Sequence, residues 1–199
     1  MIRVFKTKPA IIAAIIGGLT AIVFVAQAFF TPEKAESKPI LDYVFSLNHN
    51  DFDSYTDPTY GFSVWLPKNF IVSSLPEDQG EVIIAEHPTL NLGFEVFITP
   101  FDEEGPLTVD TIRESNPSLT VKEPMESELE DVTPAVRFVS EDPALGGSRS
   151  NETRQIWFAR DGNLFQVVLY SDNLEWLDAW ARELPFDWTF SPPQTDLTL

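Results

Sequence analysis

The chain has 199 residues, of which 43% are hydrophobic and 13% aromatic, so it can bury one sizeable core. It has no cysteine, which excludes disulfides, thiolate metal sites, iron–sulfur clusters and a cysteine nucleophile. Its formal net charge of −18 repels phosphates and anionic lipid headgroups, so we expect no nucleic-acid partner.

Residues 9–30 form an uncharged apolar run, PAIIAAIIGGLTAIVFVAQAFF. A helix of about 21 residues is long enough to span the hydrocarbon layer of a membrane. Arg3, Lys6 and Lys8 precede the run, whereas the segment after it is mixed in charge. The positive-inside rule therefore places residues 1–8 in the cytoplasm and the C-terminal bulk outside. We predict a single-pass signal-anchor in the cytoplasmic membrane.

A cleavable signal peptide is the alternative for this segment. Ala26-Gln27-Ala28 is an A-x-A site, and cleavage after Ala28 would release a secreted chain. The apolar run at 10–25 is slightly long for the hydrophobic region of a signal peptide, which favours the anchor. Both alternatives place the remaining chain on the outer side of the cytoplasmic membrane.

The segment at 31–54 contains Pro32, Pro39 and mixed charges, which predicts an extended and solvated stalk. Residues 192–199 are expected to form a disordered tail. Between these segments, residues 55–191 form the predicted globular domain. Short apolar or alternating runs inside it predict β-strands at 62–66, 82–85, 94–98, 136–139 and 188–190.

The clearest hairpin signal is TRQIWFARDGNLFQVVLY at 153–170. Asp161-Gly162 is a favoured two-residue type I′ turn, and it pairs Arg160 with Asn163. This register sets two apolar pairs on one face, Phe158 with Phe165 and Ile156 with Val167. The other face is also apolar, so the hairpin is expected at the centre of a sheet that is covered on both sides.

Two helices are predicted. Thr108 is a candidate N-cap for a helix at 109–115, with Asp110 near its positive end. In DNLEWLDAWARELP, Asp172 and Glu175 form a capping-box pattern, and Pro185 is expected to end the helix. The predicted apolar stripe of this second helix consists of Leu174, Leu177, Trp180, Ala181 and Leu184.

The element order and three short motifs resemble the PsbP-like fold, including its DcrB-type members and bacterial PsbP-like extracytoplasmic domains. The motifs are Tyr60-Gly61-Phe62-Ser63 with Pro67, Gly162 with Leu164-Phe165, and Trp188-Thr189-Phe190. The resemblance implies an α+β domain in which helices flank one antiparallel sheet as an α/β/α sandwich. It also implies a non-enzymatic module that assists a membrane complex, and it carries no functional residue to this chain.

A search for catalytic residues finds few candidates. His49 and His87 are the only histidines, and no GxSxG, HExxH or glycine-rich phosphate loop is present. We therefore expect no enzyme activity and no cofactor. Arg154 and Arg160 flank the predicted hairpin ends, where we expect them to pair with nearby acidic residues.

Clustered carboxylates are the remaining candidates for chemistry. Asp51, Asp53 and Asp57 faintly resemble a calcium loop, but the glycine and the glutamate that such a loop requires are missing. A second group consists of Asp102, Glu103 and Glu104, and a third lies at 126–131. Acidic residues this abundant serve solubility, so we expect no metal site and treat the first two groups as the candidates if one exists.

These observations predict a membrane-tethered, extracytoplasmic, non-catalytic module that binds a protein partner or assists a membrane complex. The alternatives are a carboxylate-based hydrolase and a domain that binds a small ligand or an ion. The identity of the partner does not follow from the sequence.

Overall fold

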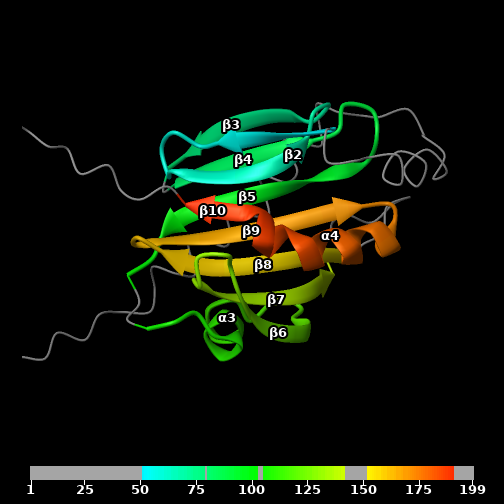
Figure 1. The fold of residues 1–199 in the computed structure, drawn as a ribbon. Coiled ribbons are helices and arrows are strands. Elements are labelled where there is room, and N and C mark those ends of the chain that lie inside the picture. Colours follow the sequence, from blue (N-terminus) through cyan, green and yellow to red (C-terminus); the bar gives the residue numbers. More distant parts are fainter. Residues whose placement is uncertain (1–50, 79, 103–104, 142–151, 191–199) are drawn as a thin grey trace, which may run out of the picture.

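A computed structural model describes residues 51–78, 80–102, 105–141 and 152–190 (Figure 1). The predicted anchor at 9–30, most of the predicted stalk and the predicted tail at 192–199 lie outside the described residues. No helix within the described ranges is both long enough and apolar enough to span a bilayer.

The smaller of two antiparallel sheets contains three strands in the order β1-β2-β10. Its strands are β1 (Phe52–Thr56), β2 (Phe62–Pro67) and β10 (Trp188–Phe190). Strand β1 begins before the boundary predicted at Tyr55, and Phe52 pairs with Pro67. Residues 52–54, which we predicted as the end of the stalk, therefore belong to the folded domain. The polar, half-exposed side chains of β1 hid this strand in the sequence.

The larger sheet contains seven strands in the order β3-β4-β5-β9-β8-β7-β6. They are β3 (Ile71–Glu77), β4 (Gly80–Glu86), β5 (Leu92–Pro100), β6 (Lys122–Glu128), β7 (Pro134–Glu141), β8 (Glu152–Arg160) and β9 (Asn163–Ser171). All neighbouring pairs in it are antiparallel.

The hairpin of β8 and β9 has the predicted register and the predicted central place. Arg160 pairs with Asn163 and Phe158 with Phe165. Asp161 and Gly162 both have positive φ angles, 49° and 74°, as a type I′ turn requires. Strand β9 lies in the middle of the seven strands, because both faces of the hairpin carry apolar side chains that need cover.

The main core lies between the two sheets. Phe62 and Val64 of β2 are fully buried against the larger sheet, and the rings of Phe62 and Trp188 stack with centroids 4.5 Å apart. Helix α4 (Leu174–Asp187) covers the rest of this face and contributes the fully buried Leu177. Each such side chain contributes about 1.5–3 kcal/mol of burial free energy.

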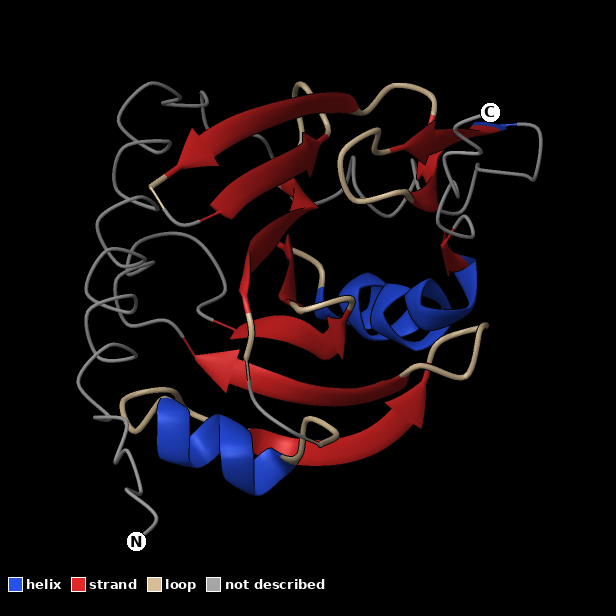
Figure 2. Ribbon diagram, turned by 90° about the vertical axis from the view of Figure 1, so that its left-hand side faces the viewer, coloured by secondary structure: helices blue, strands red, loops and turns tan. Residues whose placement is uncertain are grey.

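A second, smaller core lies on the opposite face of the larger sheet. Helix α3 (Val109–Ser115) packs Ile112 against Val136 and Phe138 of β7 and Trp157 of β8. Figure 2 shows α3 and α4 on opposite sides of the strands. The N-cap of α3 is Thr108, as predicted, and its hydroxyl accepts a hydrogen bond from the N–H of Thr111 at 3.2 Å.

The predicted α+β class with flanking helices is confirmed, but the prediction of a single sheet in an α/β/α sandwich is wrong, because the structure has two sheets. One face of the larger sheet is covered by the three-stranded sheet together with α4, so sheet packs on sheet there. The sequence also did not reveal β3 and β6, the two outer strands of the larger sheet. Most of their side chains are exposed, so the apolar pattern that marks a strand is absent.

Helix α4 differs from its prediction at both ends. The N-cap is Asn173, whose side-chain oxygen accepts from the N–H of Trp176 at 2.8 Å, whereas Asp172 accepts from Asn91. Leu174, expected in the apolar stripe, is exposed. The helix does not end at Pro185 but continues to Asp187. Pro185 has no N–H for the carbonyl of Ala181, and Arg137 on β7 donates to that carbonyl instead.

Candidate functional site

Asp57 organises the turn between β1 and β2. Its carboxylate is buried, with the residue 3% exposed, and Oδ1 accepts from the N–H groups of Thr59 at 2.9 Å and Tyr60 at 2.7 Å. The hydroxyl of Tyr55 donates to Oδ2 at 3.2 Å. Gly61 follows with a φ angle of +69°, which favours glycine. Asp57, a candidate metal ligand in the sequence, thus holds a backbone turn.

The two other aspartates of this group serve different contacts. Asp53 lies on β1 and faces the ammonium group of Lys68 at 3.8 Å, and both side chains are largely exposed. Asp51 accepts a hydrogen bond from the N–H of Lys68 through its backbone carbonyl. In the part of the chain that the structure describes, no three histidine, aspartate or glutamate side chains are grouped so that they could hold a metal ion.

In the two other acidic clusters, Asp102, Glu126 and Glu128 are exposed on the surface. Asp102 is exposed just after β5, while Glu103 and Glu104 lie outside the described residues. Glu126 and Glu128 are exposed on the outer strand β6. These positions fit the expectation that the acidic residues serve solubility.

His87 shapes the turn between β4 and β5. Its Nδ1 accepts from the N–H groups of Thr89 at 3.2 Å and Leu90 at 3.1 Å, and its ring meets that of Phe70 edge-on. Burial lowers the pKa of His87 below its usual 6.5. This histidine therefore has a structural task in its neutral form. His49 lies outside the described residues.

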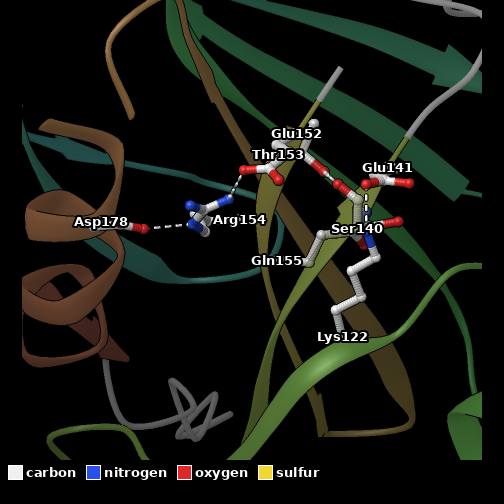
Figure 3. A network of polar contacts seen from close by, with 8 residues as sticks. All are labelled: Lys122, Ser140, Glu141, Glu152, Thr153, Arg154, Gln155 and Asp178. Atoms are coloured by element: carbon white, nitrogen blue, oxygen red, sulfur yellow. Dashed lines mark hydrogen bonds and ion pairs between the residues drawn. The ribbon is translucent and has the colours of Figure 1, made fainter. Parts of the chain in front are cut away.

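Arg154 joins α4 to the larger sheet (Figure 3). Its Nε lies 2.5 Å from Oδ1 of Asp178 on the helix, and its terminal nitrogen lies 3.4 Å from Glu152 on the same strand. The Arg154 side chain is 12% exposed, whereas that of Asp178 is 52% exposed, so water still reaches the carboxylate and screens the pair. The expected pairing of Arg154 with local acidic residues is confirmed.

Arg160 makes the corresponding contacts at the other end of β8. Its guanidinium pairs with Asp131 and Asp161, and it lies 4.1 Å from the centroid of the Phe190 ring. It thereby links the hairpin to the β6–β7 turn and to β10. Both arginines are thus committed to holding elements together, as expected from their place at the hairpin ends.

A buried chain of hydrogen bonds runs along β8 on the face that carries α3. The indole N–H of Trp157 donates to Oε1 of Gln155 at 2.8 Å, and Gln155 donates to Thr153 at 3.3 Å. The hydroxyl of Thr153 donates to the carbonyl oxygen of Ser140 on β7 at 3.4 Å. Figure 3 shows Thr153, Gln155 and Ser140 from close by. These polar groups satisfy one another, so the chain is structural.

Arg137 on β7 explains why α4 passes through a proline. Pro185 has no N–H to donate to the carbonyl of Ala181, four residues earlier. The guanidinium of Arg137 donates to that carbonyl at 3.4 Å and lies 3.0 Å from the sulfur of Met125. Its Nε is buried without a hydrogen-bond partner. The pattern of the sequence gave no sign of this contact, which joins residues far apart in the chain.

Trp65 is the most prominent exposed aromatic residue of the described domain. It is 43% exposed, whereas its neighbours in alternation on β2, Val64 and Leu66, are buried. It therefore lies on the outer face of the three-stranded sheet, opposite Ser54 of β1. The alternation of Phe62, Val64 and Leu66 already placed Trp65 on the outer face, but sequence reasoning did not single it out.

Strand β3 carries two large exposed apolar side chains at one edge of the larger sheet. Ile71 is 55% exposed and Leu75 is 41% exposed. Among the described strands, β3 pairs with β4 and forms one margin of the larger sheet. Trp65 and the exposed side chains of β3 thus belong to different sheets, and both are suited to contacts with another protein.

Comparison with known proteins shows the fold and nothing narrower. No family model matches the sequence, and no curated protein matches it either. The structure is similar to the solution structure of cyanobacterial PsbP (CyanoP) from Synechocystis sp. PCC 6803, with a TM-score of 0.53 and 12% sequence identity. The match covers 73% of this chain and 96% of that chain. The predicted PsbP-like fold is confirmed, while the DcrB-type assignment is not.

Proposed function

We propose that this protein is a non-catalytic module that binds a protein partner or assists a membrane complex on the outer side of the cytoplasmic membrane. Residues 9–30 would tether it there. The PsbP-like fold supports this proposal, because the sequence resemblance to that fold implied an accessory module. The tether rests on the apolar run and on the positive charges before it.

The observation that carries the proposal is the exposed Trp65 on the outer face of a sheet. A large aromatic side chain held on a rigid strand presents apolar area at little entropic cost, and tryptophan is enriched at the energetic centres of protein interfaces. The side chains of Ser54, Thr56 and Ser63 on the same face are small, whereas Phe52 and Pro67 pair with each other two residues along the strands. Trp65 is 43% exposed on this face. This arrangement fits a partner with a complementary apolar pocket.

The contacts of the carboxylates favour this proposal over a hydrolase. Two carboxylates of a glycosidase must face each other across the substrate, about 5–9.5 Å apart. Outside residues 183–187, Asp57 is the only buried carboxylate among the described residues, and its two oxygens hold the turn before β2. The ion-binding alternative is tested by thermal unfolding: at matched ionic strength, calcium should raise the melting temperature no more than sodium chloride does.

Site-specific photo-crosslinking in intact cells tests the proposal. A photoreactive phenylalanine derivative replaces Trp65 in the full chain, and the same residue replaces Glu128 on β6 as an exposed control. We expect a discrete adduct with another protein from position 65 and a much weaker one from position 128. Equal labelling at both positions, or adducts with lipid alone, would contradict a partner site at Trp65.

A further inference from the structure

The outer edge of β3 carries backbone groups that no described residue binds. Pro76 lies in β3 opposite Glu81 and has no N–H. A proline in a sheet takes a position whose amide faces away from the neighbouring strand. Because these groups alternate in direction along a strand, the N–H and C=O groups of Val72 and Ser74 also face away from β4. Strand β3 is at the upper margin of the described strands in Figure 1.

Over residues 71–75 this edge lacks the features that normally block strand pairing, and Pro76 and Glu77 lie only at its C-terminal end. Residues 71–75, IVSSL, carry no charge, and Ile71 and Leu75 are exposed on the same side of the strand. The opposite margin of the sheet, β6, is different: it contains Pro124, four charged residues, and an irregular register between Lys122 and Met125. Charges, proline and bulges are the usual protection of a sheet edge. These features therefore protect β6 along its length, whereas in β3 they are confined to Pro76 and Glu77.

We propose that the edge of β3 binds the same edge of a second copy of this chain, with the two strands antiparallel about a two-fold axis at Ser73. In this register Val72 of each copy lies opposite Ser74 of the other, so the outward N–H and C=O groups of both residues are satisfied. If the axis moved to Ser74, Pro76 would lie opposite Val72, and if it moved to Val72, Phe70 would lie opposite Ser74. Pro76 has no N–H, and the N–H of Phe70 already donates to Pro67.

The exposed side chains match in the same register. Ile71 of one copy lies opposite Leu75 of the other, and this pair occurs twice, on either side of the two Ser73 residues. These are non-hydrogen-bonded pairs of the new ladder, in which opposed side chains come closest, with Cβ atoms about 4.5–5.5 Å apart. The two exposed apolar side chains of β3 would thus cover each other, which favours a second copy over an unrelated strand.

The charges at the ends of the paired strands are also complementary. Glu77 and Asp78 follow the apolar part of β3, and the register brings Glu77 opposite Asn69 of the second copy, next to its Lys68. Lys68 is about half exposed and lies 3.8 Å from Asp53.

The net charge of −18 opposes association at long range, so salt should strengthen the dimer. A strand-edge contact buries less area than a standard interface, so the dimer is weak in dilute solution.

The absence of native cysteine permits a direct test in the full chain. Ser73→Cys places its thiol next to that of the second copy at the axis, within range of a disulfide. Under mild oxidation in membranes, we expect a disulfide-linked dimer with a yield about tenfold or more above that of Met125→Cys on β6, because a formed contact raises the effective concentration of the second thiol. Met125 is exposed and reports random collisions.

Two further variants test the register and the backbone pairing. Ile71→Cys and Leu75→Cys should each give little dimer alone, and should cross-link when the two variants are expressed together. Adding Ser74→Pro to Ser73→Cys removes an outward N–H without removing a bond to β4, and it should abolish the cross-link while the circular dichroism spectrum stays unchanged. The proposal is overturned if Ser73→Cys gives no more dimer than Met125→Cys, if the adduct contains a different protein, or if the proline variant cross-links fully.

Discussion

The guanidinium of Arg137 on β7 donates to the carbonyl oxygen of Ala181 on α4, the acceptor that Pro185 cannot serve. Arg137→Met should lower the free energy of unfolding by about 1 kcal/mol, because the carbonyl loses its donor. Pro185→Ala restores a backbone N–H, so the arginine should matter less in that background. Chemical denaturation of the four variants of this double-mutant cycle measures the coupling, and full additivity would contradict the link between the two residues.

Trp157 joins the buried hydrogen-bond chain of β8 to the core beneath α3. Trp157→Ala should lower the free energy of unfolding by about 3–5 kcal/mol, because a large buried side chain is lost. Urea unfolding of residues 51–191, which contain every described strand and helix, measures this change. Trp65→Ala is the matched control, and it should cost well under half as much because Trp65 is exposed. Equal losses would mean that Trp157 is not packed as described.

Tyr55 should ionise only at strongly alkaline pH. Burial first, and then the charge and the hydrogen bond of Asp57, raise the pKa of Tyr55 from 10.0 to about 12. A raised pKa stabilises the protonated folded state, so this contribution is complete below pH 10 and is lost as the pH rises toward about 12. Tyrosinate absorbance should show a late step that Tyr55→Phe removes. Asp57→Asn should move that step to lower pH, and an unchanged step would exclude Asp57 as a cause.

His87 should destabilise the fold in acid. Burial holds the pKa of His87 below 6.5 in the folded state, so the unfolded chain binds the proton more tightly. Stability from this residue is therefore present above pH 6.5 and is lost as the pH falls through the folded pKa. His87→Gln should reduce the difference in unfolding free energy between about pH 7.5 and about pH 5. A proton NMR titration that placed the pKa of His87 above 6.5 would contradict this prediction.

The proposed membrane tether predicts how the full chain fractionates. After washing with alkaline carbonate, the protein should stay in the membrane pellet, and protease added from outside should remove residues after the anchor. The recovery of a soluble chain that begins at Phe29 would instead support cleavage after Ala28 and a secreted protein.

Local chemistry explains which elements the sequence could reveal. Asp161-Gly162 allows a type I′ turn, and that turn alone sets the register in which Phe158 meets Phe165. Thr108 caps α3 through a contact three residues away. The role of Asp57 was also open to prediction, because an aspartate that accepts from the N–H groups two and three residues later is a local turn pattern. Its burial and its contact with the Tyr55 hydroxyl depend on the packing of β1 and β2.

By itself, the sequence determined the central hairpin, the start of α3 and the acidic, cysteine-free character of the protein, because turns, caps and charge depend on near neighbours. Only the tertiary structure decided that there are two sheets and that β3 and β6 are the margins of the larger one, because an outer strand is held by the backbone of its neighbour rather than by its own apolar pattern. The same holds for α4, which continues past Pro185 because Arg137 donates to the carbonyl of Ala181, 44 residues away in the sequence. Contacts between distant residues set these features, and only folding brings such residues together.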